Sequence, residues 1–124
     1  HTKAVLGERL DLYSGDDALT LPFMAVGAVG IVSVAAHWAG PEFAAMVARA
    51  AKGDWDGARA MNERLAPSYA FESSEAYPNP MPSRAALRAL GVETGECRAP
   101  HARGDADLAA AARSVVAALL DQRG

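Results

Sequence analysis

The sequence predicts an α/β fold in which one βαβ unit is followed by about five helical segments. Two short apolar stretches, residues 10–13 and residues 30–34, each lead into a turn or a helical pattern. From residue 35 onward the apolar residues recur at helical spacing, without a further strand pattern. Because two parallel strands are too few for an independent sheet, we expect this unit to belong to a larger α/β structure.

The composition excludes several classes of function. The 124 residues carry 12 basic and 15 acidic side chains, and neither sign forms a run that would attract nucleic acid or an anionic membrane. A single cysteine, Cys97, cannot form an internal disulfide and is typical of a protein from the reducing cytoplasm. The longest apolar stretch, residues 23–36, is shorter than the ~18 residues of a membrane span. The N-terminal residues show no signal-peptide pattern, so no secretion signal is expected.

The ends of the strands and of the helix in the βαβ unit are marked by turn and capping residues. Its first strand runs into the turn Ser14-Gly15-Asp16-Asp17, and Asp16 or Asp17 is expected to cap a helix over residues 18–26. Pro22 is tolerated in the first turns of that helix, and Gly27 ends it. The second strand, residues 30–34, is β-branched and nearly all apolar, which predicts burial on both sides.

The next two helices are delimited by proline, glycine and aspartate. Pro41 is expected to open a helix over residues 42–52, because proline suits a first helical position, and Gly53 closes that helix. Asp54 then caps a helix that Pro67 either kinks or ends. Three aromatic residues of this region are expected to pack in the core: Trp55, Tyr69 and Phe71.

The remaining segments follow the same signals. The proline-rich loop of residues 72–82 leads to Ser83, which is expected to cap a helix over residues 84–90. Gly91 ends that helix. After a second loop, Asp105 or Asp107 caps a helix that runs to about residue 122.

The histidines and glycines do not form the pattern of a metal site or a dinucleotide site. His37 is expected to be a packed or loop residue, and His1 and His101 lack the neighbours of a metal ligand set. The glycines of Gly27-Ala28-Val29-Gly30 precede a strand, whereas a dinucleotide fingerprint follows one. No metal and no cofactor are therefore predicted.

Three quoted segments together resemble a known family. They are Leu-Tyr-Ser-Gly-Asp-Asp at residues 12–17, Val-Gly-Ala-Val-Gly-Ile-Val-Ser-Val at residues 26–34, and Pro-Asn-Pro at residues 78–80 ahead of Ser-Arg-Ala-Ala-Leu at residues 83–87. In this order they are similar to the C-terminal part of the 4-hydroxy-tetrahydrodipicolinate synthases, within the superfamily that also contains N-acetylneuraminate lyase.

The resemblance implies a fold and an activity. Residues 1–52 would form the last two strands, with their helices, of a (β/α)₈ TIM barrel, and residues 53–124 a C-terminal helical extension. The parent would be a cytoplasmic homo-oligomer, commonly a tetramer. It would condense pyruvate with aspartate semialdehyde through a Schiff base, in lysine biosynthesis by way of diaminopimelate.

The resemblance also assigns site residues. The Schiff-base lysine of the family would lie roughly two dozen residues before Ser14, and neither Lys3 nor Lys52 fits that place. No catalytic residue is therefore expected in this chain, which alone should be inactive. The resemblance places the Gly15 backbone and Val32 at the pyruvate pocket, with Ser14, Asp16 and Asp17 supporting the loop.

Two alternatives remain open from the sequence. The parent is another pyruvate-dependent aldolase of the same superfamily, or the chain is a non-catalytic structural or interaction fragment. The second alternative follows from the strands, whose apolar edges need covering by another chain segment.

Overall fold

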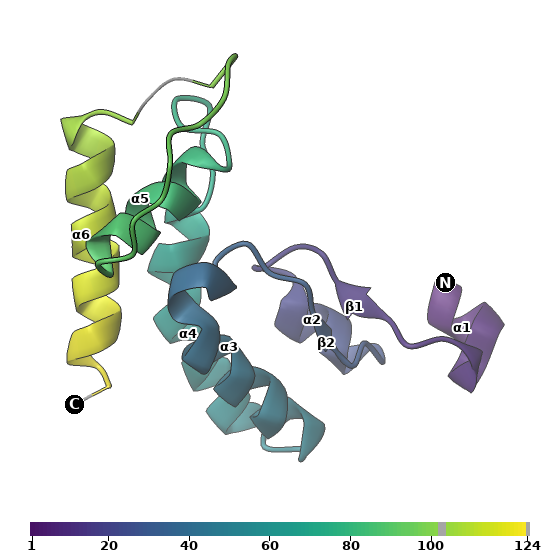
Figure 1. Ribbon diagram of the computed structural model, residues 1–124. Coiled ribbons are helices and arrows are strands. Elements are labelled where there is room, and N and C mark those ends of the chain that lie inside the picture. Colours follow the sequence, from purple (N-terminus) through teal and green to yellow (C-terminus); the bar gives the residue numbers. More distant parts are fainter. Residues whose placement is uncertain (102–103, 124) are drawn as a thin grey trace.

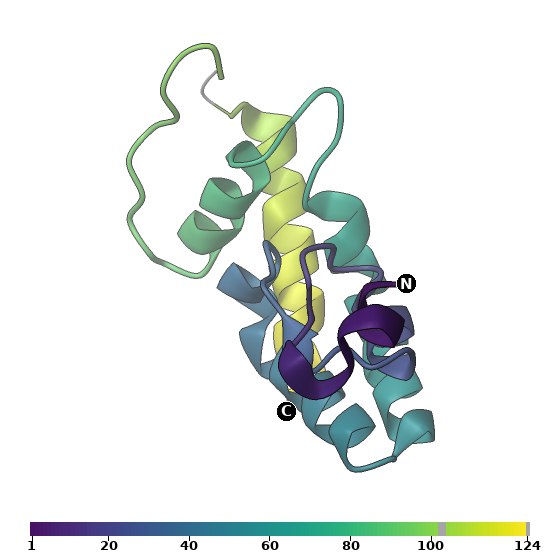
Figure 2. The same cartoon turned by 90° about the vertical axis from the view of Figure 1, so that its right-hand side faces the viewer.

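The computed structural model describes residues 1–101 and 104–123, which form a small βαβ unit beside a group of helices. The elements are α1 (Thr2–Leu6), a 3₁₀ turn (Gly7–Arg9), β1 (Tyr13–Ser14), α2 (Thr20–Ala25), β2 (Gly30–Ile31), α3 (Ala36–Ala51), α4 (Trp55–Phe71), α5 (Met81–Ala89) and α6 (Ala106–Asp121). In Figure 1, β1 and β2 lie on one side of the pair α3 and α4, and α6 lies on the other side. In Figure 2, α6 lies behind the N-terminal elements.

The two strands pair in parallel, as a βαβ unit requires. Tyr13 lies opposite Gly30, and Ser14 lies opposite Ile31. The Val32 amide also donates to the Ser14 carbonyl over 2.8 Å, so the pairing continues past the assigned strands. The predicted parallel unit is present, although its strands are shorter than the apolar stretches suggested.

One face of the sheet is open. The side chain of Tyr13 is 58% exposed and that of Val32 is 74% exposed, so the prediction that the second strand is buried on both sides is wrong for this chain. The opposite face packs on helices, where Ser14 is buried and Ile31 lies against the core. The physical reason is that the described residues supply a covering layer on one side only.

The helix α3 begins earlier than its proline predicted. It starts at Ala36 and is kinked at Ala39, whose backbone is non-helical, two residues before Pro41. A proline inside a helix lacks an amide hydrogen and crowds the preceding turn, which accounts for a kink at this place. The predicted segment from residue 42 is thus the straight part after the kink.

The helix α4 begins where predicted and passes through Pro67 to Phe71 without ending. The carboxylate of Asp54 caps it by accepting a hydrogen bond of 3.0 Å from the Gly57 amide. The expectation that Trp55 packs in the core is wrong, because its side chain, in the first turn after the cap, is 43% exposed. Trp38, which the sequence indicated as either a core residue or a subunit contact, lies in the core at 2% exposure, as does Phe43 at 3%.

The start of α5 also differs from the prediction. The helix begins at Met81, with Pro80 as the N-cap, so Ser83 lies inside it and the predicted cap is wrong. Pro82 fits the first turn, where a missing amide hydrogen costs no hydrogen bond. The Ser83 hydroxyl donates over 2.8 Å to the amide oxygen of Asn79, which holds the preceding loop against the helix.

One apolar core joins the two parts of the sequence. Its buried members come from α2 through α6 and are Met24, Ala35, Trp38, Ala39, Phe43, Met46, Ala50, Ala58, Leu65, Ala86, Val116 and Leu119. They lie on both sides of the boundary expected between residues 52 and 53, where Gly53 turns the chain from α3 into α4 with a φ of 79°. The helical region therefore packs directly on the strand-bearing region.

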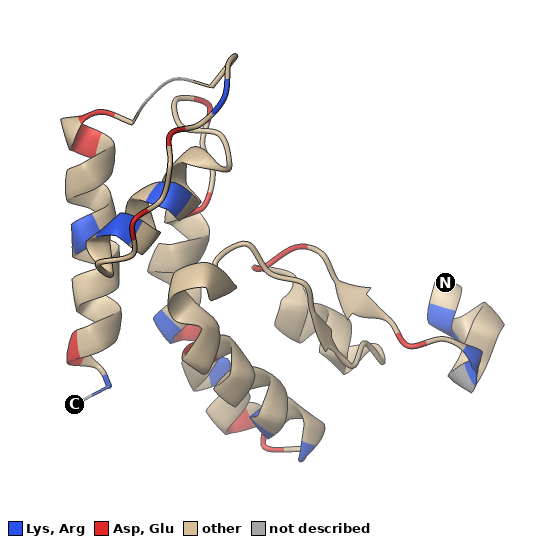
Figure 3. Cartoon of the chain, viewed as in Figure 1, with Lys and Arg blue, Asp and Glu red and all other residues tan. Residues whose placement is uncertain are grey.

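Charges are dispersed over the helices rather than gathered by sign, as Figure 3 shows. Within the described part of the chain, no helix is both long enough and apolar enough to cross a membrane.

Candidate functional site

The turn after β1 is closed by its own serine. Ser14 is fully buried, and its hydroxyl donates to the Asp16 carbonyl over 2.7 Å while accepting from the Asp16 amide over 3.2 Å. This pair of hydrogen bonds folds the chain tightly around Gly15. Ser14 therefore shapes the turn after β1, and its support of a substrate pocket stays a prediction.

Asp16 and Asp17 have different roles. The exposed carboxylate of Asp16 accepts from the Leu19 amide over 3.0 Å, so it caps the turn that leads into α2. The buried carboxylate of Asp17 accepts instead from the Ser33 hydroxyl over 2.9 Å and from the Ala35 amide over 2.7 Å. Asp17 therefore does not cap α2, and it joins the loop after β1 to the loop after β2.

Gly15 and Val32 directly follow the two strands at their carboxyl ends. The register pairs Ser14 with Ile31, so the next positions along the two strands are Gly15 and Val32. Both are exposed, and no heavy atom lies within 4 Å of the place that a Gly15 side chain would take. The pair offers free backbone beside an apolar side chain, which suits a small ligand, although pyruvate contact stays a prediction.

The two lysines lie away from this edge. The side chain of Lys3 runs over Gly27, with its Cγ 3.2 Å from the position of a Cβ there. Gly27 precedes β2, so Lys3 lies towards the amino ends of the parallel strands. Lys52 is an exposed residue at the end of α3. Lys3 thus lies in the helix before the first strand and Lys52 at a later helix end, as the sequence indicated, and the absence of a Schiff-base lysine from this chain stays a prediction.

Other candidate groups add no catalytic cluster. His37 is exposed in the first turn of α3, at the helix rather than in a loop or in the core. Among residues 1–101 and 104–123, no three histidine, cysteine or acidic side chains are arranged to hold a metal ion.

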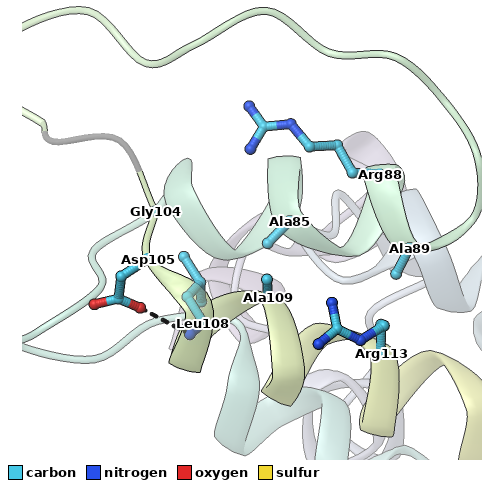
Figure 4. A pocket seen from close by; sticks show the side chains of 8 residues that line it. All are labelled: Ala85, Arg88, Ala89, Gly104, Asp105, Leu108, Ala109 and Arg113. Carbon is cyan, nitrogen blue, oxygen red and sulfur yellow. Dashed lines mark hydrogen bonds between the residues drawn. The ribbon is translucent and has the colours of Figure 1, made fainter.

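Two cavities lie outside the carboxyl edge of the strands. One, of about 480 Å³, lies between α1 and the strands and is lined by His1, Thr2, Lys3, Ala4, Leu12, Tyr13, Phe23, Val26 and Ala28. The other, of about 260 Å³, lies between α5 and α6. Figure 4 shows small alanine side chains facing each other across it, while Arg88 points away from α6 towards the loop. Arg88 donates there to the Gly95 carbonyl over 3.1 Å.

A half-buried acid, Glu72, was not recognised from the sequence. It follows Phe71 at the end of α4, where the sequence indicated only the start of a loop. Its Oε2 atom is buried, and burial together with a hydrogen bond to Asp17 raises the pKa of Glu72 to about 8. Burial also raises the pKa of Tyr69, and the negative charges of Asp17 and Glu72 add to that effect. The only local signal was an acidic residue directly after an apolar and aromatic helix end.

Parallel strands backed by helices, with polar turns at the carboxyl ends, define the class of α/β proteins that place their sites at that edge, as α/β-barrel enzymes do. The fold is consistent with part of such a barrel. The chain belongs to the dihydrodipicolinate synthetase family, whose pattern it matches over residues 1–120.

Similar proteins carry the name of one enzyme. The chain is 48% identical over 94 residues to the 4-hydroxy-tetrahydrodipicolinate synthase of Synechococcus sp. strain CC9902, which covers 76% of this chain and 30% of that protein. For the enzyme of strain CC9605 the identity is 43% over 113 residues, with coverage of 91% and 37%. The crystal structure of dihydrodipicolinate synthase from Aquifex aeolicus superimposes with a TM-score of 0.83 at 33% identity, over 93% of this chain and 39% of that one.

The chain thus spans about a third of the length of the curated relatives that it matches.

Proposed function

We propose that this chain is the C-terminal part of a pyruvate-dependent Schiff-base lyase that acts as a 4-hydroxy-tetrahydrodipicolinate synthase. The observation that carries the proposal is the edge formed by Gly15 and Val32, which lies open on parallel strands at the place where barrel enzymes bind substrate. The name of the relatives, 4-hydroxy-tetrahydrodipicolinate synthase, supports this activity, and aspartate semialdehyde as the second substrate is part of the proposal.

In the proposed reaction, this chain contributes contacts to the bound pyruvate, and the reactive lysine comes from the rest of the protein. A lysine amine from the upstream strands attacks the pyruvate carbonyl, releases water and forms the imine, which loses a methyl proton to become the nucleophilic enamine. The free backbone at Gly15 allows close approach of the pyruvate, and Val32 packs on its apolar side. The cytoplasm and a homo-oligomeric assembly belong to the same proposal.

Reductive trapping tests whether the reactive lysine lies outside this chain. Pyruvate and borohydride are added to the 124-residue chain and to the longest natural form that contains it, and each product is measured by intact mass. We expect a pyruvate adduct only on the longer form. An adduct on Lys3 or Lys52 of the shorter chain would overturn the assignment, and no adduct on either form would remove the lyase proposal.

A substitution at Val32 tests its contact with pyruvate. In the longer form, Val32→Asp should raise the KM for pyruvate roughly tenfold or more, because a charge replaces an apolar wall. Val92→Asp is the matched control, since Val92 is exposed beyond α5. An unchanged KM in Val32→Asp would place the pyruvate elsewhere.

A second candidate is a non-catalytic interaction role. The observation in its favour is the exposed apolar surface near the strands, which includes Val26 at 72% and Val32 at 74% exposure. An apolar surface of this kind is typical of contact with another chain or chain segment.

A further inference from the structure

The start of α3 is capped by a residue from a different loop. Its own N-cap residue, Ala35, has no side chain that could accept a hydrogen bond. The Ala35 amide donates instead to Asp17 Oδ2 over 2.7 Å. The Ala36 amide donates to the Ser33 hydroxyl over 2.8 Å, and that hydroxyl donates to the same Oδ2 atom over 2.9 Å. One carboxylate oxygen from the loop after β1 therefore holds the loop after β2 and the beginning of α3.

The surroundings of Asp17 make this contact strong. Asp17 is 2% exposed, so water competes little for its carboxylate. Hydrogen bonds to a charged acceptor are stronger than those between neutral groups. The amino-terminal end of a helix carries a partial positive charge, which also favours a carboxylate at this place. Without the carboxylate, the buried amide of Ala35 would lose its partner.

Gly15 and Val32 each lie between two fixed points. On the strand side, the Val32 amide donates to the Ser14 carbonyl over 2.8 Å. On the other side, Asp17 lies two residues after Gly15 and binds Ser33, which directly follows Val32. Hydrogen bonds to Asp17 thus continue the link between the two chain segments beyond the paired strands.

We propose that Asp17 is a positioning residue that fixes the spacing of Gly15 and Val32 and thereby limits the candidate pocket to the smallest 2-oxo acids. All 2-oxo acids share the carboxylate and the carbonyl, and they differ in the size of the alkyl group. Val32 is the apolar wall that this alkyl group would meet, while Gly15 leaves room for close approach. The inference rests on the proposed function in identifying the bound group as a 2-oxo acid.

A competition between two 2-oxo acids tests the size limit. The longest natural form of the protein receives equal amounts of pyruvate and 2-oxobutyrate and is reduced with borohydride. Intact mass separates the two adducts, because they differ by one methylene group. An apolar pocket discriminates one methylene group by about 10–200-fold. We expect the unaltered protein to favour pyruvate, and the ratio of adducts in Asp17→Ala to move roughly tenfold towards 2-oxobutyrate.

Matched variants separate positioning from a general loss of stability. Asp17→Asn keeps an oxygen that can accept from both donors, so it should restore most of the ratio. Ser33→Ala removes one donor and should move the ratio in the same direction as Asp17→Ala, by less. Asp54→Ala removes the cap of α4, at the opposite end of α3 from the candidate pocket, and should leave the ratio unchanged. An unchanged ratio in both Asp17→Ala and Ser33→Ala would overturn the size limit, as would an equal shift in Asp54→Ala.

Hydrogen exchange keeps this inference apart from the proposed function, because it needs no substrate. Protection of a peptide that contains residues 33–36 should fall about tenfold in Asp17→Ala and stay unchanged in Asp54→Ala. Full protection in Asp17→Ala would overturn the positioning role whatever the trapping shows. The absence of any adduct on the unaltered protein would instead remove the lyase proposal, and the exchange result would still decide whether Asp17 holds the two loops.

Discussion

At the scale of single residues, one ion pair joins distant parts of the chain. Arg123 donates to both carboxylate oxygens of Glu42, over 2.7 and 2.8 Å, and also to the Trp38 carbonyl over 3.3 Å. The Glu42 side chain is 4% exposed, so its charge depends on this partner. The hydrogen bonds from Arg123 lower the pKa of Glu42.

Replacement of Arg123 should lower the stability of the fold. Arg123→Ala leaves a buried carboxylate without its partner and should lower the free energy of unfolding by about 2–3 kcal/mol. Urea denaturation measures the loss, and Arg113→Ala, a change of an exposed arginine in α6, is the matched control. Equal stability of the two variants would show that water replaces Arg123.

The same pair predicts a pH dependence. Because the folded pKa of Glu42 is lowered, its stabilisation is present above the ~4.3 of a free glutamate and is lost as the pH falls through the folded value. Arg123→Ala should therefore flatten the acid limb of the curve of stability against pH. If the stability of Arg123→Ala fell as steeply at low pH as that of the unaltered protein, the loss of stability in acid would come from other carboxylates.

The sequence predicted some of these side-chain roles and not others. The bond from the Leu19 amide to Asp16 was foreseeable, because the two residues lie three positions apart, although α2 itself begins at Thr20 without a side-chain cap. The bonds of Asp17 to Ser33 and Ala35 span 16 and 18 residues and depend on how the strands pair. Glu72 was missed for the same reason, since only the tertiary fold buries its Oε2 atom.

At the scale of elements, helix ends were better predicted than strand lengths. Asp54 and Asp105 cap their helices through amides three residues later, so a short sequence window contains the whole signal. Strands are different, because their length depends on the neighbours that pair with them. The two strands here pair with each other, and each is assigned only two residues.

The glycine after α5 offers an element-scale prediction. Gly91 has a φ of 83°, a backbone conformation that strains other residues, and its amide donates to the Arg88 carbonyl over 2.9 Å. Gly91→Ala should therefore lower the free energy of unfolding by about 1 kcal/mol.

Thermal unfolding of matched variants checks this value. Gly95→Ala is the control, because Gly95 lies in the following loop without a positive φ and with room for a methyl group. The argument from backbone strain would fail if both substitutions lowered stability equally.

At the scale of the whole molecule, the open apolar surface should govern association. Val26 is 72% exposed at the end of α2, next to the strands, outside the loops of the candidate pocket. The chain alone should associate as its concentration rises, because contact between such surfaces removes apolar area from water.

Sedimentation velocity over a concentration series measures this association. Val26→Lys should weaken it, while Val92→Lys, which charges an exposed valine after α5, should leave it unchanged. A chain that stays monomeric at all concentrations would show that the apolar surface does not drive contact, and would weaken the interaction role.

The ion pair between Glu42 and Arg123 also sets an order of events during synthesis. The two residues are 81 positions apart, so a ribosome that adds 5–20 residues per second delivers the arginine about 4–16 s after the glutamate. During that interval α3 and α4 emerge and can pack, while the carboxylate of Glu42 remains hydrated. The nascent protein therefore dehydrates this charge late, and a pause in translation between the two codons would prolong the exposure of the surface that α6 covers.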